Sequence, residues 1–173
     1  DSTVHFSENN SIIVERGAKL IIHNSTLKGL PINDCNNGTW QGIKVWGNNT
    51  VDHADLFPAG SDPNTLTASD YESVVLSATD PGVVIMKENS RIEDAPTAIS
   101  TFKGDEYSNA NYYGGIVYVE NSHFYNNSRG VAFMLHDDPL NFSQFRNTQF
   151  TADNNSLFAP IFHGVTLWAV NQV

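Results

Sequence analysis

A six-residue pattern recurs along this 173-residue chain and constrains its fold more than any other feature. Its six positions hold, in order, an apolar residue, a polar residue, an Asn, a Ser or a Thr, any residue, and a second apolar residue. It occurs at 22–27, 119–124 and 145–150, and a shorter copy at 89–92 follows a stretch that is one residue too long or bulged. Such copies predict stacked units, because one short unit cannot bury its apolar residues alone.

Short apolar runs between the turn residues predict strands rather than helices. They lie at Ile12–Val14, Leu20–Ile22, Ile43–Val45, Val74–Leu76, Val83–Ile85, Ile116–Val119 and Val131–Met134. Segments 92–99 and 124–131 also align without a gap. Asn tolerates the left-handed backbone conformation, so we expect the recurring Asn at tight corners. The sequence predicts an all-β fold, a right-handed parallel β-helix (solenoid) with loop insertions between its coils. An antiparallel sandwich with ordinary loop Asn residues is the alternative.

We expect one β-helix domain over residues 1–173 that is a fragment of a longer chain. Insertions at about 47–81 and 102–113, and a shorter excursion at 136–140, interrupt the coils. We expect them to project as loops, where binding residues on a rigid scaffold usually lie. The unpaired strand edges of an uncapped solenoid also predict flanking coils or end-to-end contacts.

The charge balance excludes several partners. Nineteen acidic residues oppose nine basic ones, for a formal net charge of −10. Nucleic acids and anionic membrane surfaces bind Lys and Arg, so neither is an expected partner. No apolar run approaches the roughly 20 residues that span a bilayer, so we expect no membrane insertion.

Several stretches resemble a known group of proteins, the β-helix modules of large secreted Bacteroidetes proteins. The resemblance lies in Ile12-x-Val14-x-x-Gly17-Ala18-x-Leu20-x-Ile22-x-Asn24-Ser25-x-Leu27, in Trp40-Gln41-Gly42-Ile43-x-Val45-x-Gly47, in Gly114-Gly115-Ile116 and in His163–Trp168. Many such proteins are type IX secretion substrates, so the resemblance implies an extracellular or cell-surface location. The pectate-lyase-like superfamily shares the right-handed form of this fold. That similarity implies, as an alternative, a polysaccharide lyase or glycoside hydrolase activity.

Asp137 and Asp138 are the weak catalytic candidates. Glycoside hydrolysis uses two carboxylates across the scissile bond, and neighbouring carboxylates can divide the acid and base roles. Adjacent residues on a strand point to opposite faces, so both could act only from a bent loop. The other interpretation is a solvated turn between coils.

The acidic first insertion raises the possibility of a calcium site, with Asp52, Asp55, Asp62 and Asp70 as weak candidate ligands. Calcium takes six to eight oxygen ligands, largely carboxylates and carbonyls. The spacing of these residues matches no calcium-binding loop, and a solvated acidic loop is the other interpretation. No other cofactor is predicted.

Aromatic residues in or beside the insertions are candidate binding residues: Tyr107, Tyr112, Tyr113 and Trp46. Their rings could stack on sugars or contact a protein, or could instead pack the insertion against the coils. We therefore expect a non-enzymatic structural or adhesive module that binds a glycan or a cell-surface protein and adjoins flanking domains. The carbohydrate-active enzyme is the alternative.

Overall fold

The structure, a computed structural model, describes residues 2–33, 36–104, 109–136, 141–153, 158 and 163–168. These residues form three parallel sheets and one short antiparallel ribbon. The predicted all-β class and the predicted parallel strands are thereby confirmed.

The strands are distributed over sheets that we call A, B, C and D. In order across each sheet, sheet A contains β1 (Ser2–Phe6), β4 (Ser25–Gly29), β9 (Arg91–Glu93), β12 (His123–Tyr125) and β15 (Gln149–Thr151). Sheet B contains β2 (Ile12–Val14), β7 (Ile43–Val45), β10 (Thr97–Ser100), β13 (Arg129–Met134) and β16 (His163–Trp168). Sheet C contains β3 (Lys19–His23), β8 (Val83–Lys87), β11 (Ile116–Glu120) and β14 (Gln144–Arg146). The ribbon, sheet D, pairs β5 (Pro31–Asn33) with β6 (Asn36–Asn37).

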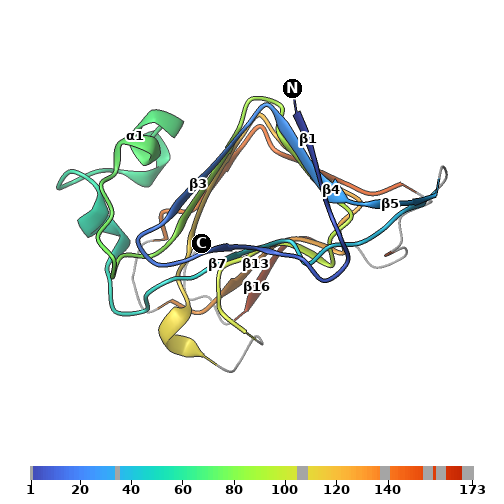
Figure 1. The fold of residues 1–173 in the computed structure, drawn as a ribbon. Coiled ribbons are helices and arrows are strands. Elements are labelled where there is room, and N and C mark those ends of the chain that lie inside the picture. Colours follow the sequence, from blue (N-terminus) through green and yellow to red (C-terminus); the bar gives the residue numbers. More distant parts are fainter. Residues whose placement is uncertain are drawn as a thin grey trace.

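The chain visits the sheets in a fixed cyclic order. It passes from A to B to C and back to A, apart from the β5–β6 ribbon between β4 and β7. Each strand pairs in parallel with the strand that follows it in the same sheet, as β9 pairs with β12 and β12 with β15. Viewed along the direction of stacking, the three sheets form the sides of a triangle (Figure 1).

The core lies inside this triangle. Side chains alternate between the two faces of a strand, so every second residue points inward. In sheet A the inward column runs through Leu27, Ile92, Phe124 and Phe150. Phe124 is fully buried, and its ring stacks on that of Phe150 with centroids 4.9 Å apart. The pairing of Phe124 with Phe150, and of Val119 with Phe145, confirms the alignment of the sequence repeats.

The corner between sheets C and A holds the recurring Asn residues. Asn24, Asn121 and Asn147 have φ of 46°, 48° and 45°, so the predicted left-handed corners are confirmed. At the shorter copy of the repeat, the register places three residues between Lys87 and Arg91 where only two separate His23 from Thr26, which confirms the predicted extra residue. Both Glu88 and Asn89 have positive φ. An additional left-handed residue lets the chain turn the same corner with one residue more.

Three long connections, β7 to β8, β10 to β11 and β13 to β14, all leave the corner between sheets B and C. The first contains η1 (His53–Leu56), η2 (Pro63–Thr65) and α1 (Ala68–Ser73), and the second contains η3 (Ala110–Tyr112). Figure 1 shows α1 outside sheet C rather than projecting as a free loop. Phe57, Leu66 and Tyr71 explain this placement, because they pack on outward-facing Ile85 and Tyr118 of sheet C.

The predicted strand at Val74–Leu76 is wrong. Val74 is the C-cap of α1, and Val75 is 92% exposed. Three β-branched or aliphatic residues form a strand only beside a neighbour in register, and this run lies outside the stacked sheets. No helix among the described residues is long and apolar enough to cross a membrane.

Candidate functional site

The outer face of sheet A, which we call the polar face, carries two columns of polar side chains. The residue that follows the Ser or Thr of each repeat points outward, and the register aligns Thr26, Arg91, His123 and Gln149. Glu93, Tyr125 and Thr151 form a second column, and Lys28 contacts it through Glu93. Two outward positions on each short strand therefore define this face.

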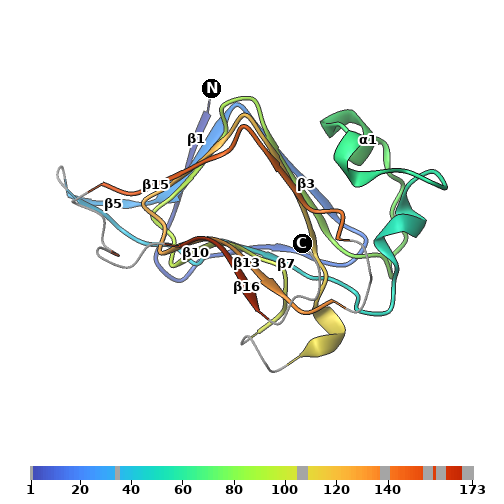
Figure 2. The same ribbon diagram turned by 180° about the vertical axis from the view of Figure 1, so that it is seen from behind.

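The described helical segments of the insertions lie away from the polar face. Among the described residues, the helical segments lie outside sheet C and beside the corner between sheets B and C (Figures 1 and 2). The outer side of sheet A, which carries β1, β4 and β15 in these views, has none of them.

A hollow of about 510 Å³ lies where the polar face meets the Asn corners. It is lined by Glu88, Asn89, Arg91, Asn121, Ser122, His123, Asn147 and Gln149. Three of these are the stacked corner amides, and Asn147 Nδ2 donates a hydrogen bond of 2.6 Å to Asn121 Oδ1. All eight lining residues are polar, so they can form hydrogen bonds with a ligand that is rich in hydroxyl groups.

The charged groups beside the hollow are tied to one another. Arg91 Nε lies 2.9 Å from Glu93 Oε1, and Lys28 Nζ lies 3.6 Å from Glu93 Oε2. The Arg91 guanidinium also lies 5.0 Å from the centre of the Tyr125 ring. Glu93 is buried, and two cations compensate its charge, as a buried carboxylate requires. The pair fixes the position of Arg91 at the edge of the hollow.

His123 and Tyr125 supply uncharged polar groups. Burial, and then the charge of Arg91, lower the pKa of His123, and Glu93 opposes this shift. The imidazole is consequently neutral at neutral pH, and its Nε2 lies 2.6 Å from Thr151 Oγ1. The Tyr125 hydroxyl donates a 2.6 Å hydrogen bond to Asp153 Oδ2, and this bond raises the pKa of the phenol.

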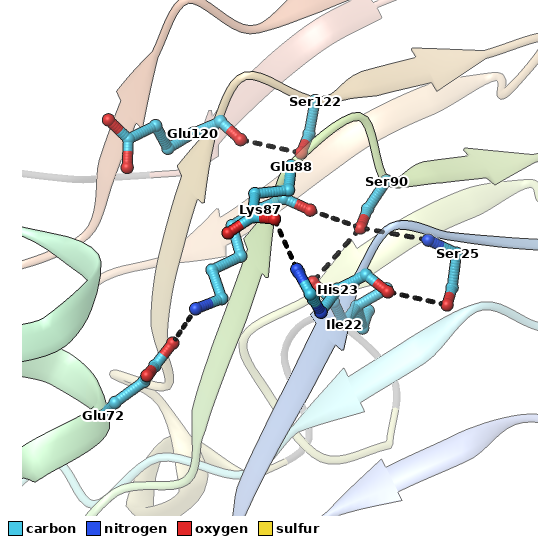
Figure 3. A network of polar contacts seen from close by, with 9 residues as sticks. All are labelled: Ile22, His23, Ser25, Glu72, Lys87, Glu88, Ser90, Glu120 and Ser122. Atoms are coloured by element: carbon cyan, nitrogen blue, oxygen red, sulfur yellow. Dashed lines mark hydrogen bonds and ion pairs between the residues drawn. The ribbon is translucent and has the colours of Figure 1, made fainter. Parts of the chain in front are cut away.

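The rim of the hollow is held by the corner network drawn in Figure 3. His23 Nε2 and Glu88 Oε2 lie 2.5 Å apart, and this hydrogen bond lowers the pKa of Glu88. The Ser90 hydroxyl lies 2.5 Å from the Lys87 carbonyl and 3.1 Å from the Ile22 carbonyl, which share its single proton. These bonds join successive corners, so the backbone beneath the hollow is fixed before any ligand binds.

The hydroxyl of the repeat has the same function at other corners. Ser25, Ser122 and Thr148 each donate to the carbonyl two residues earlier, at 2.8, 2.8 and 3.2 Å. A Ser or Thr after Asn therefore satisfies a backbone acceptor at the turn.

The predicted binding aromatics lie elsewhere. Trp46 and Tyr112 form an edge-on pair with ring centroids 5.6 Å apart. Lys103 Nζ lies 4.0 Å from the Trp46 ring and 4.4 Å from the Tyr112 ring, and the Arg16 guanidinium lies 4.2 Å from the latter. Cations of the chain itself therefore cover these ring faces. Tyr113 is buried beside Phe102, Ala132 and Met134, and Tyr107 lies outside the described residues.

The predicted acidic candidates are used in local structure. Asp52 Oδ1 accepts from the Ala54 amide (2.8 Å) and Asp62 Oδ1 from the Asn64 amide (2.9 Å), so each caps a short helix. Asp70 Oδ2 accepts from the Thr67 amide and hydroxyl, which lowers the Asp70 pKa. Asp55 is an exposed residue of η1.

No three His, Cys, Asp or Glu side chains gather closely enough to hold a metal ion within the part of the chain that the structure describes. The two weak catalytic candidates, Asp137 and Asp138, lie outside the described residues.

Sequence reasoning missed the residues of the polar face, although the signal was present. Arg91, His123 and Gln149 occupy the variable position of the repeat, between its hydroxyl and its second apolar residue. Read as a column rather than as single residues, that position identifies an outward-facing surface.

Comparison of the chain with protein-family models, with curated proteins and with solved structures finds no match. The function is therefore inferred from the geometry and chemistry of the polar face.

Proposed function

We propose that this chain is a section of a right-handed parallel β-helix that works outside the cell as a non-enzymatic module and binds a glycan on its polar face. The cyclic order in which the chain visits the sheets supports the β-helix, because each circuit adds one strand to each sheet. The right hand follows from the strong steric preference for right-handed connections between parallel strands of one sheet. The resemblance of residues 12–27 and 40–47 to secreted Bacteroidetes modules supports the extracellular location.

The polar hollow is the observation that carries the choice of ligand. Its volume of about 510 Å³ lies in the range of small-molecule sites. Asn, Gln, Ser and neutral His offer both donors and acceptors, which match the hydroxyl groups of a sugar. The centre of a protein–protein interface is instead depleted in charge and enriched in aromatic residues. A glycan of low charge therefore fits this surface better than a protein.

The carboxylates of the polar face favour binding over the alternative of a polysaccharide lyase or glycoside hydrolase. Glycoside hydrolysis needs one carboxyl group as a proton donor and a second as a base or nucleophile. Glu93 instead lies between Arg91 and Lys28, and Asp153 accepts a hydrogen bond from Tyr125. These contacts anchor the face.

A glycan-array screen of the 173-residue chain, followed by titration of a neutral hit, tests the proposal. We expect the double variant His123→Ala/Gln149→Ala to weaken binding at least tenfold, a loss of about 1.4 kcal/mol. Lys44→Ala is the matched control, because Lys44 lies between inward-facing Ile43 and Val45 on the outer side of sheet B. This control should bind like the wild type.

Three results contradict the proposal. Absence of binding to any glycan refutes the ligand class, and equal affinity of the double variant and the control refutes the location. Cleavage of a polysaccharide by the wild type supports the enzymatic alternative instead.

A further inference from the structure

Two aromatic side chains stand nearly at right angles beside the corner between sheets B and C. Trp46 directly follows β7, and Tyr112 is the last residue of η3, the yellow helical turn in Figure 1. Their ring planes are inclined at 77°, with the ring centroids 5.6 Å apart. Rings at this angle form two walls of a cage, because a cation between them can lie against the negative faces of both.

Hydrogen bonds hold the two walls in this position. The Gly47 amide, next to Trp46, donates to the Tyr112 carbonyl at 2.9 Å. Arg16 Nε donates to the Gly47 carbonyl at 2.8 Å, and Arg16 Nη2 donates to the Asn111 carbonyl. These bonds involve the backbone of both segments, so they fix the walls whatever cation lies between the rings. A site that is formed in advance loses less free energy on binding.

The ammonium of Lys103 occupies this cage. Lys103 Nζ lies 4.0 Å from the centre of the Trp46 ring and 4.4 Å from the centre of the Tyr112 ring. Within the described part of the chain, this ammonium has neither a hydrogen bond nor an ion pair. Aromatic faces attract a cation, but they replace only weakly the three hydrogen bonds that a primary ammonium makes in water. Lys103 is therefore an imperfect occupant of the cage.

The Trp46 ring also carries an unused donor. Its Nε1 is buried and has no hydrogen-bond acceptor among the residues that the structure describes. A buried indole N–H usually has an acceptor, and leaving it without one costs free energy. A ligand with an oxygen atom close to its cationic group could give this donor an acceptor.

We propose that Trp46 and Tyr112 form a binding site for a quaternary ammonium group, and that Lys103 blocks this site until such a ligand displaces it. A quaternary ammonium has no N–H group, so it loses no hydrogen bond when it moves from water to the aromatic walls. It carries one positive charge, as Lys103 does, so the exchange adds no charge beside Arg16, whose guanidinium lies 4.2 Å from the Tyr112 ring. The net charge of −10 favours the approach of a cation.

The tethered lysine sets the affinity of the intact chain. A group attached to the same molecule competes at an effective concentration of about a millimolar or more. A free ligand must outcompete Lys103, so removal of the lysine side chain should strengthen binding. The cage lies apart from the polar face, and this inference does not depend on the proposed glycan binding.

Titration with choline, followed by NMR, tests the proposal. Choline carries a quaternary ammonium group and a hydroxyl, and aromatic walls shift its methyl-proton resonance upfield when it binds. We expect Lys103→Ala to bind choline at least fivefold more tightly than the wild type. Adding Trp46→Leu or Tyr112→Leu to that variant should abolish the gain. Ethanolamine, which is choline without its methyl groups, should bind Lys103→Ala at least fivefold more weakly than choline does.

Lys44→Ala is the matched control. It removes the same charge from the outer side of sheet B, two residues before Trp46, and leaves Lys103 in place. Its affinity for choline should equal that of the wild type, which separates opening of the cage from a change in the local field. Competition with phosphatidylcholine vesicles then distinguishes a free ligand from a lipid head group, and binding of either supports the site.

Protein NMR spectra of all variants establish that they are folded. The proposal is overturned if Lys103→Ala binds choline no more tightly than the wild type. It is also overturned if ethanolamine binds as well as choline, because the site would then recognise charge alone. Retention of the full choline affinity by either folded double variant overturns it too, because the rings would then not be the site.

Discussion

His53 is a fully buried histidine that joins three distant segments. Its Nε2 lies 2.9 Å from the Gly114 carbonyl, and its Nδ1 accepts from the Phe142 amide at 3.4 Å. The His136 ring stacks on it with centroids 4.4 Å apart. Burial, and then the neighbouring His136, lower the pKa of His53 to about 3. The ring is therefore neutral in the folded protein throughout the physiological range.

This buried imidazole makes stability depend on pH. The pKa is about 3 in the folded chain and about 6.5 in the unfolded chain, which therefore binds the proton first. The contribution of His53 is complete above pH 6.5 and is lost as the pH falls toward 3, by up to about 1.4 kcal/mol per pH unit. In NMR titrations, the His53 ring resonances should stay constant from about pH 8 to about pH 5. A midpoint near the ordinary histidine value would contradict the prediction.

The corner asparagines were predictable from sequence, whereas the histidine pair was not. Asn24, Asn121 and Asn147 repeat at one position of a local pattern, and the tolerance of Asn for positive φ gives that pattern a structural meaning. His53 and His136 share no local pattern. Their contact arises only when the first and third connections lie side by side, and no periodicity in the chain encodes that proximity.

At the scale of elements, α1 depends on sheet C for its stability. Six residues are too few for an isolated helix in water. Lys19 Nζ donates to the carbonyls of Glu72 (2.6 Å) and Val74 (2.8 Å), at the end of the helix. Lys87 Nζ pairs with Glu72 Oε1 at 2.6 Å (Figure 3), and the Tyr71 hydroxyl donates to the Phe142 carbonyl at 2.5 Å.

Lys19→Met should loosen this helix without unfolding the sheets. Burial lowers the pKa of Lys19, but the side chain is only partly buried, so the loss of its two hydrogen bonds should cost about 1 kcal/mol. Amide exchange in residues 66–76 should become roughly fivefold faster, while β11 and β12 exchange as before. Lys44→Met on sheet B is the control. Equal acceleration in the sheets would show that Lys19 supports the whole fold instead.

Strands were predictable where the repeat supplied a neighbour, whereas the packing of the first insertion on sheet C was not. The runs at Val83–Ile85 and Ile116–Val119 lie in strands that pair with each other in register. Val74–Leu76 has a similar composition but ends a helix, because α1 and the aromatic residues before it cover sheet C. Amino-acid composition alone does not distinguish a strand of a sheet from an apolar segment that packs on the outside of that sheet.

For the molecule as a whole, stability is expected to vary along the stack. In a structure built from successive circuits, each circuit contacts only its neighbours, so those at the ends lack half of their contacts. Amide exchange should be slowest in β9 and β12, which have a neighbour on both sides, and faster in β1 and β15. The measurement belongs at a concentration where the chain is monomeric. Uniform protection across sheet A would indicate all-or-none unfolding and contradict this expectation.

The parallel stacking of the strands could be predicted from the spacing of the repeats, since identical patterns at intervals place identical side chains over one another. The residues of the polar face were missed although Arg91, His123 and Gln149 share one position of the repeat, because they form one surface only when the copies are read as the aligned strands β9, β12 and β15.

The location of the three long connections at one corner has a consequence for engineering. Closing a longer loop costs free energy only with the logarithm of its length, and these connections already vary widely. A foreign peptide grafted between β10 and β11 should therefore leave the pairing register of these strands unchanged. The corner between sheets C and A does not tolerate added residues in this way. At Glu88 and Asn89, a single additional residue requires two consecutive positive φ angles.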